Sequence, residues 1–297
     1  MENNRIRGHL AALLTIGIWG TTFISTKILL KDFLPVEILF FRFILGYIAL
    51  WCVFPHNPGL NSKKQELTFM AAGLCGICLY YLLENVSLNF TLASNVGVII
   101  SIAPFFTAIL SHIFIKSDEK PEISFFAGFI LAMIGIGFIS FGGSSLTLNL
   151  KGDLLAMAAA FVWACYSILT RKISTFAMPT VYTTRRTFFY GILFMIPALF
   201  LFDFHPDLKR LANPLYAFNI IFLGLGASAL CFVTWNYAVK ILGAVKTSVY
   251  IYMVPVITVV TSILVLQEKI TLFSIIGMIF TVAGLFLSEM KYHEKQG

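Results

Sequence analysis

The residue type best placed to do chemistry is an acid inside an apolar stretch: Glu84 lies within LYYLLENVSL, residues 79–88. On a helix, Tyr80 and Glu84 share one face, and Tyr81 and Asn85 share the neighbouring face. Charged side chains inside a membrane-spanning helix are costly and tend to face the interior of the helix bundle. This strip is suited to bind an ammonium group, to carry a proton as a coupling residue, or to anchor the outer end of its helix near water. The sequence leaves these roles open.

Aromatic and amide side chains recur inside other apolar runs. Trp19 and Trp163 lie about 18 Å along their helices at 1.5 Å per residue, which is deeper than the interfacial position typical of Trp in membrane proteins. We expect them either to line a cavity or to pack together on a symmetry axis. With Asn236, Tyr237 and Tyr250 in later runs, they are candidates for a pocket that binds an amphipathic metabolite.

Three further residues are candidates for gates or hinges. Pro104 and Pro255 lie inside apolar runs, where proline lacks an N–H group and bends a helix. Each bend is either a fixed kink or a hinge. Lys27 closes the first apolar run, and we expect it to shape an outer gate or to anchor that end of the helix.

The composition places these residues in a membrane protein. Of 297 residues, 59% are hydrophobic and 12% are charged, with a mean hydropathy of +0.88, whereas soluble domains carry about 25% charged residues. A hydrocarbon core about 30 Å thick needs roughly 20 apolar residues per helix. Ten such runs predict an all-α integral membrane protein with ten transmembrane helices. The predicted spans are residues 8–30, 35–54, 66–88, 92–115, 122–142, 151–172, 180–202, 214–239, 244–266 and 270–289.

The second half of the chain repeats the first. Trp, Pro and Arg recur in order at a shift of 144 residues, and Asn and Pro recur at a shift of 151. We therefore divide the chain into residues 1–145 and 146–297, each with five spans. Because five is odd, the second repeat enters the membrane from the opposite side, and inverted repeats of this kind are typical of secondary transporters with a substrate site where the halves meet. The matched pairs include Trp19 with Trp163, Thr26 with Thr170, Pro35 with Pro179, Arg42 with Arg186, Asn85 with Asn236, Pro104 with Pro255 and Glu119 with Glu268.

The first repeat resembles an EamA-type repeat of the drug/metabolite transporter superfamily, and the second repeat shares the pattern. The resemblance is carried by WGTTFISTKILLKDFLPVEILFFRFIL, SNVGVIISIAPFFTAIL and DEKPEISFFAGFILAMIGIGFIS. It implies ten helices with both ends in the cytoplasm, a central cavity lined by both halves, and transport of small metabolites, often export of amino acids or related compounds.

The second repeat departs from this pattern at Ala164, where the first has Gly20, and at Val181, where the first has Glu37. Glu37 and Arg42 are five residues apart, too far round a helix to pair, so we expect Arg42 to bond another helix or a loop carbonyl.

The distribution of positive charge predicts the orientation. With the N-terminus inside, 14 of the 21 Lys and Arg residues fall at the inner ends of the spans, and short basic loops stay in the cytoplasm. Both termini are therefore predicted to be cytoplasmic, in a multi-pass protein of the cell membrane. The net charge of +7 comes from scattered short loops, which does not support binding to nucleic acid.

Other functions have weaker support. The five His residues lie at or near span ends and the five Cys residues lie inside apolar runs, which favours neither an embedded enzyme nor a metal centre, and we expect no cofactor and no metal. A proton-coupled importer, a carrier of another metabolite class and a non-transporting scaffold or channel stay as alternatives. The expected partners are a small-molecule substrate and the lipid bilayer, and the sequence does not indicate an oligomeric state. We expect a ligand between spans 3, 4, 8 and 9.

Overall fold

A computed structural model describes the chain as helices joined by short loops, over residues 2–59, 62–87, 90, 93–115, 122–141, 149–202, 204–205, 207–266 and 271–289. The α-helices are α1 (Glu2–Leu29), α2 (Pro35–Val53), α3 (Lys63–Gly73), α4 (Tyr80–Ser87), α5 (Ala93–Ile100), α6 (Ala103–Phe114), α7 (Ile123–Phe141), α8 (Leu150–Ser174), α9 (Thr180–Leu201), α10 (Pro214–Ile221), α11 (Cys231–Leu242), α12 (Ala244–Val249), α13 (Met253–Leu266) and α14 (Leu272–Glu289). Two π-helical segments (Leu74–Leu79 and Phe222–Leu230) and two 3-10 segments (Leu208–Ala212 and Tyr250–Tyr252) complete the described helices.

These elements form ten apolar segments where the sequence predicts ten spans. The π-helical segments join α3 to α4 and α10 to α11, which gives continuous helices over Lys63–Ser87 and Pro214–Leu242. Within the described ranges, six helices are long and apolar enough to cross a membrane, and four shorter apolar helices supply the other spans. The prediction of an all-α membrane fold is therefore confirmed.

The span limits differ by a few residues from the predicted ones. α1 begins at Glu2 instead of residue 8, and the third span begins at Lys63 instead of 66. The sixth span continues to Ser174 and the eighth to Leu242. Hydropathy marks only the part of a helix that is apolar, whereas the helices continue through polar residues at their ends.

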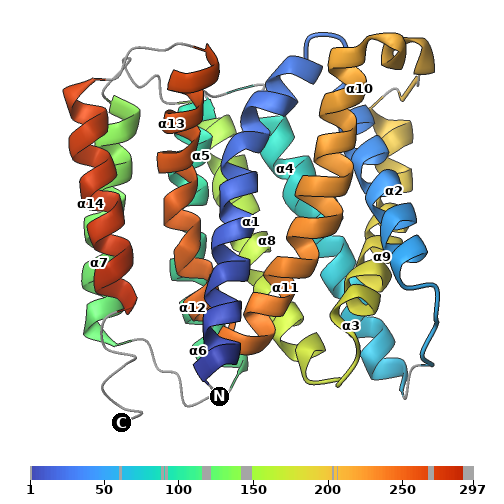
Figure 1. The fold of residues 1–297 in the computed structure, drawn as a ribbon, viewed down its shortest axis with the longest axis horizontal. Helices are drawn as coiled ribbons and strands as arrows, with labels where there is room; N and C mark the ends of the chain where they lie inside the picture. The colour runs from blue at the N-terminus through green and yellow to red at the C-terminus, as the bar shows by residue number, and fades with distance from the viewer. Residues whose placement is uncertain are drawn as a thin grey trace.

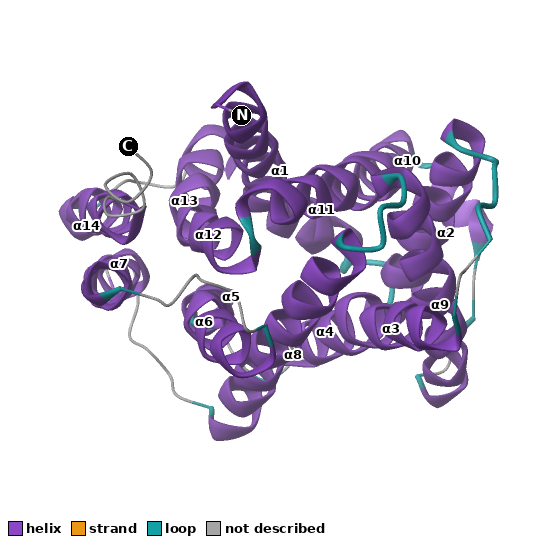
Figure 2. Cartoon of the chain, turned by 90° about the horizontal axis from the view of Figure 1, so that it is seen from below, coloured by secondary structure: helices purple, strands orange, loops and turns teal. Residues whose placement is uncertain are grey.

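The two halves of the chain enter the bundle from opposite faces (Figure 1). α1 starts at the face that carries the N-terminus, whereas α8 runs toward that face, and α14 also ends there. Seen along the helices, the bundle has two rows that each mix both halves (Figure 2). In one row α1 packs against α11 and α13, and in the other α8 packs against α4 and α6. These matched contacts confirm the inverted repeat.

Glycines bring the last helix of each repeat together. α7 and α14 lie side by side at one end of the bundle (Figures 1 and 2). A Cβ atom at Gly135 would lie 2.5 Å from the backbone nitrogen of Thr281, and one at Gly284 would lie 2.5 Å from that of Ala132. Only glycine permits this approach, which is the usual role of small residues between membrane helices.

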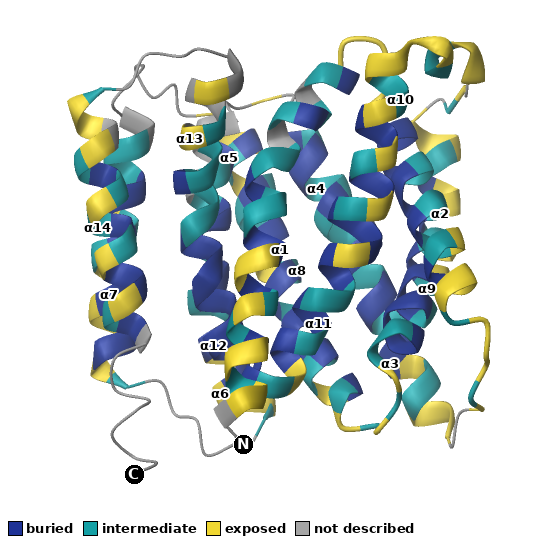
Figure 3. Cartoon of the chain, viewed as in Figure 1, coloured by how far each residue is buried: buried dark blue, intermediate teal, exposed yellow. Residues whose placement is uncertain are grey.

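Burial is greatest along the middle of the bundle, whereas the outer faces of the helices are exposed (Figure 3). Many of the exposed side chains are large and apolar, including Leu13, Phe200 and Leu264. A soluble protein rarely exposes so much contiguous apolar surface. This surface is suited to contact with lipid, and the polar candidates for function lie inside it.

Candidate functional site

A cavity lies between the two rows of helices, in the half of the bundle away from the N-terminal face. It measures about 70 Å³, or about 610 Å³ when the open space at its mouth is included, so its enclosed part is smaller than the roughly 300–1,000 Å³ of small-molecule sites. α1, α4, α8 and the fourth and ninth spans form its wall. The lining residues are Trp19, Thr22, Tyr80, Tyr81, Glu84, Gly97, Ile100, Ser101, Trp163, Ile251 and Val254.

Two of the lining spans are interrupted at equivalent points of the repeats. The fourth span breaks at residues 101–102, between α5 and α6, and the ninth contains the 3-10 segment Tyr250–Tyr252. Pro104 and Pro255 follow these interruptions and lie in the first turn of α6 and of α13, where a missing N–H costs no hydrogen bond within the helix. Interrupted spans that line a cavity are typical of substrate sites in transport proteins.

Trp19 and Trp163 meet edge to face, with ring centroids 5.3 Å apart. The indole Nε1 of Trp19 donates a hydrogen bond of 2.9 Å to the carbonyl oxygen of Ala227 in the second π-helical segment. The Nε1 of Trp163 is buried and has no hydrogen-bond partner among the described residues. The two indoles therefore contact each other and also line the cavity. The sequence treats packing and cavity lining as alternatives, whereas the structure combines them.

Glu84 is the acid of the cavity wall. Its residue is 8% exposed, and among the described residues no basic side chain forms an ion pair with its carboxylate. Arg42 attracts it electrostatically but does not line the cavity. The Nε atom of Arg42 donates to Ser228 Oγ at 2.9 Å, and its guanidinium lies 4.9 Å from the ring centroid of Tyr81. A carboxylate without a contacting cation and beside aromatic rings can bind a cationic group of a ligand.

On the N-terminal side of the Trp pair, side-chain hydrogen bonds join the helices, and the cavity beside Asn236 has room for only about 10 Å³, so we describe this side as closed. Asn236 Oδ1 accepts a hydrogen bond of 2.8 Å from Tyr166 Oη, and its Nδ2 donates one of 2.9 Å to Thr184 Oγ1. These bonds join α11 to α8 and α9. His9 Nδ1 and Tyr250 Oη are 2.5 Å apart and join α1 to the ninth span.

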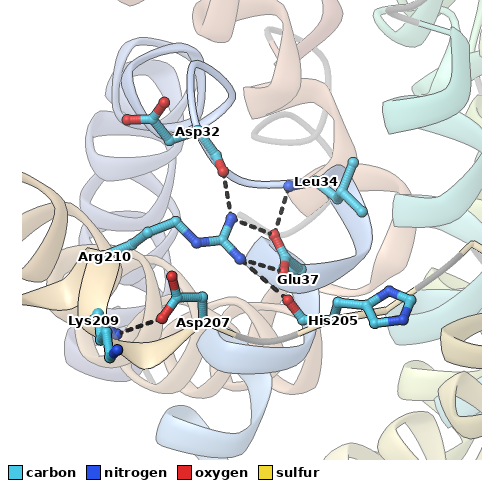
Figure 4. Close-up of polar contacts among 7 residues, drawn as sticks. All are labelled: Asp32, Leu34, Glu37, His205, Asp207, Lys209 and Arg210. Carbon is cyan, nitrogen blue, oxygen red and sulfur yellow. Dashed lines mark hydrogen bonds and ion pairs between the residues drawn. The ribbon is translucent and has the colours of Figure 1, made fainter.

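At the opposite face a buried acid at the start of α2 joins the first repeat to the 3-10 segment Leu208–Ala212 of the second (Figure 4). Glu37 is 1% exposed, and its Oε1 accepts from Arg210 Nη2 at 2.8 Å, while its Oε2 accepts from the backbone nitrogen of Leu34 at 2.8 Å. Arg210 also donates to the carbonyl oxygens of Asp32 and His205. Glu37 therefore pairs with the second repeat, and the prediction that Arg42 bonds another helix, at Ser228, is confirmed.

The cavity brings together five of the nine predicted binding residues, namely Trp19, Tyr80, Tyr81, Glu84 and Trp163. The other four lie outside its wall. Asn85 is buried on α4, Asn236 and Tyr250 belong to the closed N-terminal side, and Tyr237 is half-buried on α11. Inversion of the repeats carries equivalent positions away from the Trp pair to opposite halves of the bundle, which places Asn236 and Asn85 on different sides of that pair. The side chain of Lys27 lies outside the described residues.

Sequence reasoning missed several small residues of the wall, and it placed the ligand between spans 3, 4, 8 and 9. The wall includes spans 3, 4 and 9 and also uses spans 1 and 6, whereas none of its lining residues belongs to span 8. Thr22 follows Trp19 by one helical turn, which was a usable signal for a shared face. Gly97 and Ser101 precede Pro104, but their place on the wall depends on the break in the fourth span, which residue types alone do not reveal.

Comparisons with known proteins agree with this fold. The model of the EamA-like transporter family matches residues 6–141 and 150–290. A protein of Archaeoglobus fulgidus named an uncharacterized transporter is 29% identical over 96% of this chain and 98% of its own. Bacillus subtilis YyaM and YdfC, also named uncharacterized transporters, are 28% and 24% identical over at least 93% of either chain. A solved crystal structure shares the fold, with a TM-score of 0.76 and 17% identity over 95% of this chain and 98% of the other.

Proposed function

Because the chain belongs to the EamA-like transporter family, we propose that it is a secondary active transporter that exports amino acids or related small metabolites across the cell membrane by alternating access. The observation that supports this proposal is the cavity between the repeats. It lies on one side of the Trp pair, and on the other side hydrogen bonds of Asn236 join the helices. Rocking of one repeat against the other would open the closed side and close the open one.

The chemistry of the wall supports a substrate with an ammonium group and an apolar part. Glu84 offers a negative charge, and the rings of Trp19, Tyr80 and Trp163 offer faces for apolar and cationic groups. The ring centroids of Tyr80 and Trp163 are only 4.8 Å apart, so the wall is a continuous aromatic surface. Amino acids with apolar side chains and related amines meet these requirements.

Glu84 also suits the role of coupling residue. A buried carboxylate that takes up a proton when a cationic substrate leaves, and releases that proton when the next substrate binds on the other side, exchanges protons for substrate. Export driven by the inward proton gradient follows if Glu84 is protonated from outside while the cavity faces that side. The N-terminal face is taken as cytoplasmic because most Lys and Arg residues lie there.

Uptake of labelled metabolites into proteoliposomes, with and without a proton gradient, tests the function. We expect saturable flux for part of an amino-acid and amine panel, and stimulation by the gradient that disappears in Glu84→Gln. Asp153→Asn, which removes an acid outside the cavity, serves as the matched control and should keep the stimulation. Absence of saturable flux across the panel would favour a scaffold, and flux without saturation would favour a channel.

A further inference from the structure

A second cavity opens on the flank of the bundle near the N-terminal face. It lies between the end of α2, the loop that follows it and the first half of α9, and it measures about 580 Å³ including its mouth. Its wall includes Trp51, Asn57, Tyr182, Arg185, Arg186 and Phe189. None of these residues lines the cavity between the repeats, so the transport site does not account for them.

The wall carries one positive charge that no described carboxylate neutralises. Arg186 Nη2 pairs with Glu66 at 2.5 Å. Arg185 is 6% exposed and donates to two backbone carbonyls, those of Phe54 and of His56, the latter at 2.9 Å. Within the described ranges it forms no ion pair. A guanidinium buried against neutral carbonyls is stabilised by an anion, and its remaining N–H groups match the geometry of phosphate oxygens.

Exposed aromatic residues border this cavity. Trp51 is 52% exposed and Phe189 is 47% exposed, and exposed aromatic residues near the end of a membrane helix mark the depth of the lipid headgroups. Val53 and Leu193 continue the exposed apolar surface along α2 and α9. A ligand in this cavity would therefore contact the guanidinium of Arg185 at one end and apolar side chains along the rest of its length.

The residues of this cavity are not repeated at the equivalent positions of the other repeat. At the shift of 144 residues, Arg185 corresponds to Phe41 and Trp51 corresponds to Met195. At these equivalent positions the opposite face thus has neither a guanidinium nor an indole. The basic cavity is a property of the N-terminal face alone, which is the face where the sequence gathers most of its positive charge.

We propose that this cavity binds the phosphodiester of an anionic phospholipid such as phosphatidylglycerol. The phosphate accepts hydrogen bonds from Arg185 and is oriented by Asn57, and the acyl chains lie along Trp51 and Phe189. Basic pockets between membrane helices hold anionic headgroups in this way. A free phosphate would meet the same cation but would leave the apolar flank unused, so the geometry favours the lipid. The proposal does not depend on the transported substrate.

Quenching of Trp51 fluorescence by brominated lipids tests this site in proteoliposomes of the full chain. The signal of Trp51 is the difference between the parent protein and Trp51→Phe. We expect brominated phosphatidylglycerol to quench it more strongly than brominated phosphatidylcholine. Arg185→Gln should weaken the preference about fivefold, the effect of one basic residue at an anionic surface. Arg171→Gln, which removes an Arg at the same face and outside this cavity, should keep it.

Asn57→Asp provides a second variant, because Asn57 is exposed and its replacement leaves the bonds of Arg185 to the loop intact. A carboxylate at this position neutralises the cavity and should also reduce the preference. Equal quenching by the two lipids in the parent, or a preference that survives in Asn57→Asp, overturns the proposal. Displacement of phosphatidylglycerol by soluble glycerol phosphate would assign the cavity to a free phosphate ester and would also overturn it.

Discussion

The closed N-terminal side gives a prediction with a definite size. Asn236→Ala removes the hydrogen bonds to Tyr166 and Thr184 that join α11 to α8 and α9. Each bond contributes about 1 kcal/mol, so the closed arrangement should lose about 2 kcal/mol. A difference of about 1.4 kcal/mol is tenfold in an equilibrium constant, and the ratio of open to closed protein should therefore rise roughly 30-fold.

Labelling of a cysteine at Thr187 measures this change. Thr187 lines the small cavity beside Asn236 and is 2% exposed, and its hydroxyl donates to the carbonyl oxygen of Thr183 on the same helix. In a background where the exposed Cys52 is Ser, Thr187→Cys should react slowly with a membrane-impermeant maleimide. Adding Asn236→Ala should accelerate this labelling reaction. The acceleration should reach roughly 30-fold if opening of the N-terminal side limits the labelling rate.

A matched control separates opening from general loosening. Asn219 is buried like Asn236, but its amide donates to the carbonyl oxygen of Leu215 in its own helix, and it forms no bond to another helix among the described residues. Asn219→Ala should therefore leave the labelling rate at Thr187→Cys unchanged. Equal rates in the Asn236→Ala and parent backgrounds, with both proteins monodisperse, would refute the role assigned to these bonds.

Three further predictions concern helix packing, the Trp pair of the cavity wall and the ion pair between Glu37 and Arg210. Gly135→Ala should lower the free energy of unfolding by about 1–3 kcal/mol, because the added methyl group overpacks α7 against α14, and the melting temperature should fall. Gly17→Ala should not lower the melting temperature, because an added Cβ there meets nothing within 4 Å. Trp19→Phe should lower the melting temperature because it loses the bond to Ala227, and Trp163→Phe should change the Km for transport with a smaller loss of stability. Arg210→Gln leaves Glu37 buried without its cation and should lower the melting temperature more than Arg171→Gln, and equal shifts would contradict the importance of this pair.

The fold follows closely from the sequence because its signals are local and strong. Ten apolar runs and the recurrence of Trp19 as Trp163 are enough to predict spans and inverted repeats. The spacing of Glu37 and Arg42 also predicts correctly that they do not pair. The pattern does not predict that Arg210 is the partner of Glu37, because Arg210 lies in a short 3-10 segment far along the chain.

The candidate site follows from the sequence only in part. Glu84, Tyr80 and Tyr81 share one short helix, so helical geometry alone places them together. Asn236 and Tyr250 have the same residue chemistry but lie on the other side of the Trp pair. The inversion of the repeats carries equivalent residues to opposite halves of the bundle unless they lie near its middle, as Trp19 and Trp163 do, so similarity of position is a poor guide to proximity elsewhere.

The central claim, alternating access through the cavity between the repeats, is tested most directly by labelling both sides in one experiment. Ser101→Cys reports on the cavity that contains Glu84, and Thr187→Cys reports on the closed N-terminal side. A transported substrate should change the two labelling rates in opposite directions, since opening of one side requires closing of the other. Rates that rise together, or that stay constant while substrate is transported, would contradict the account.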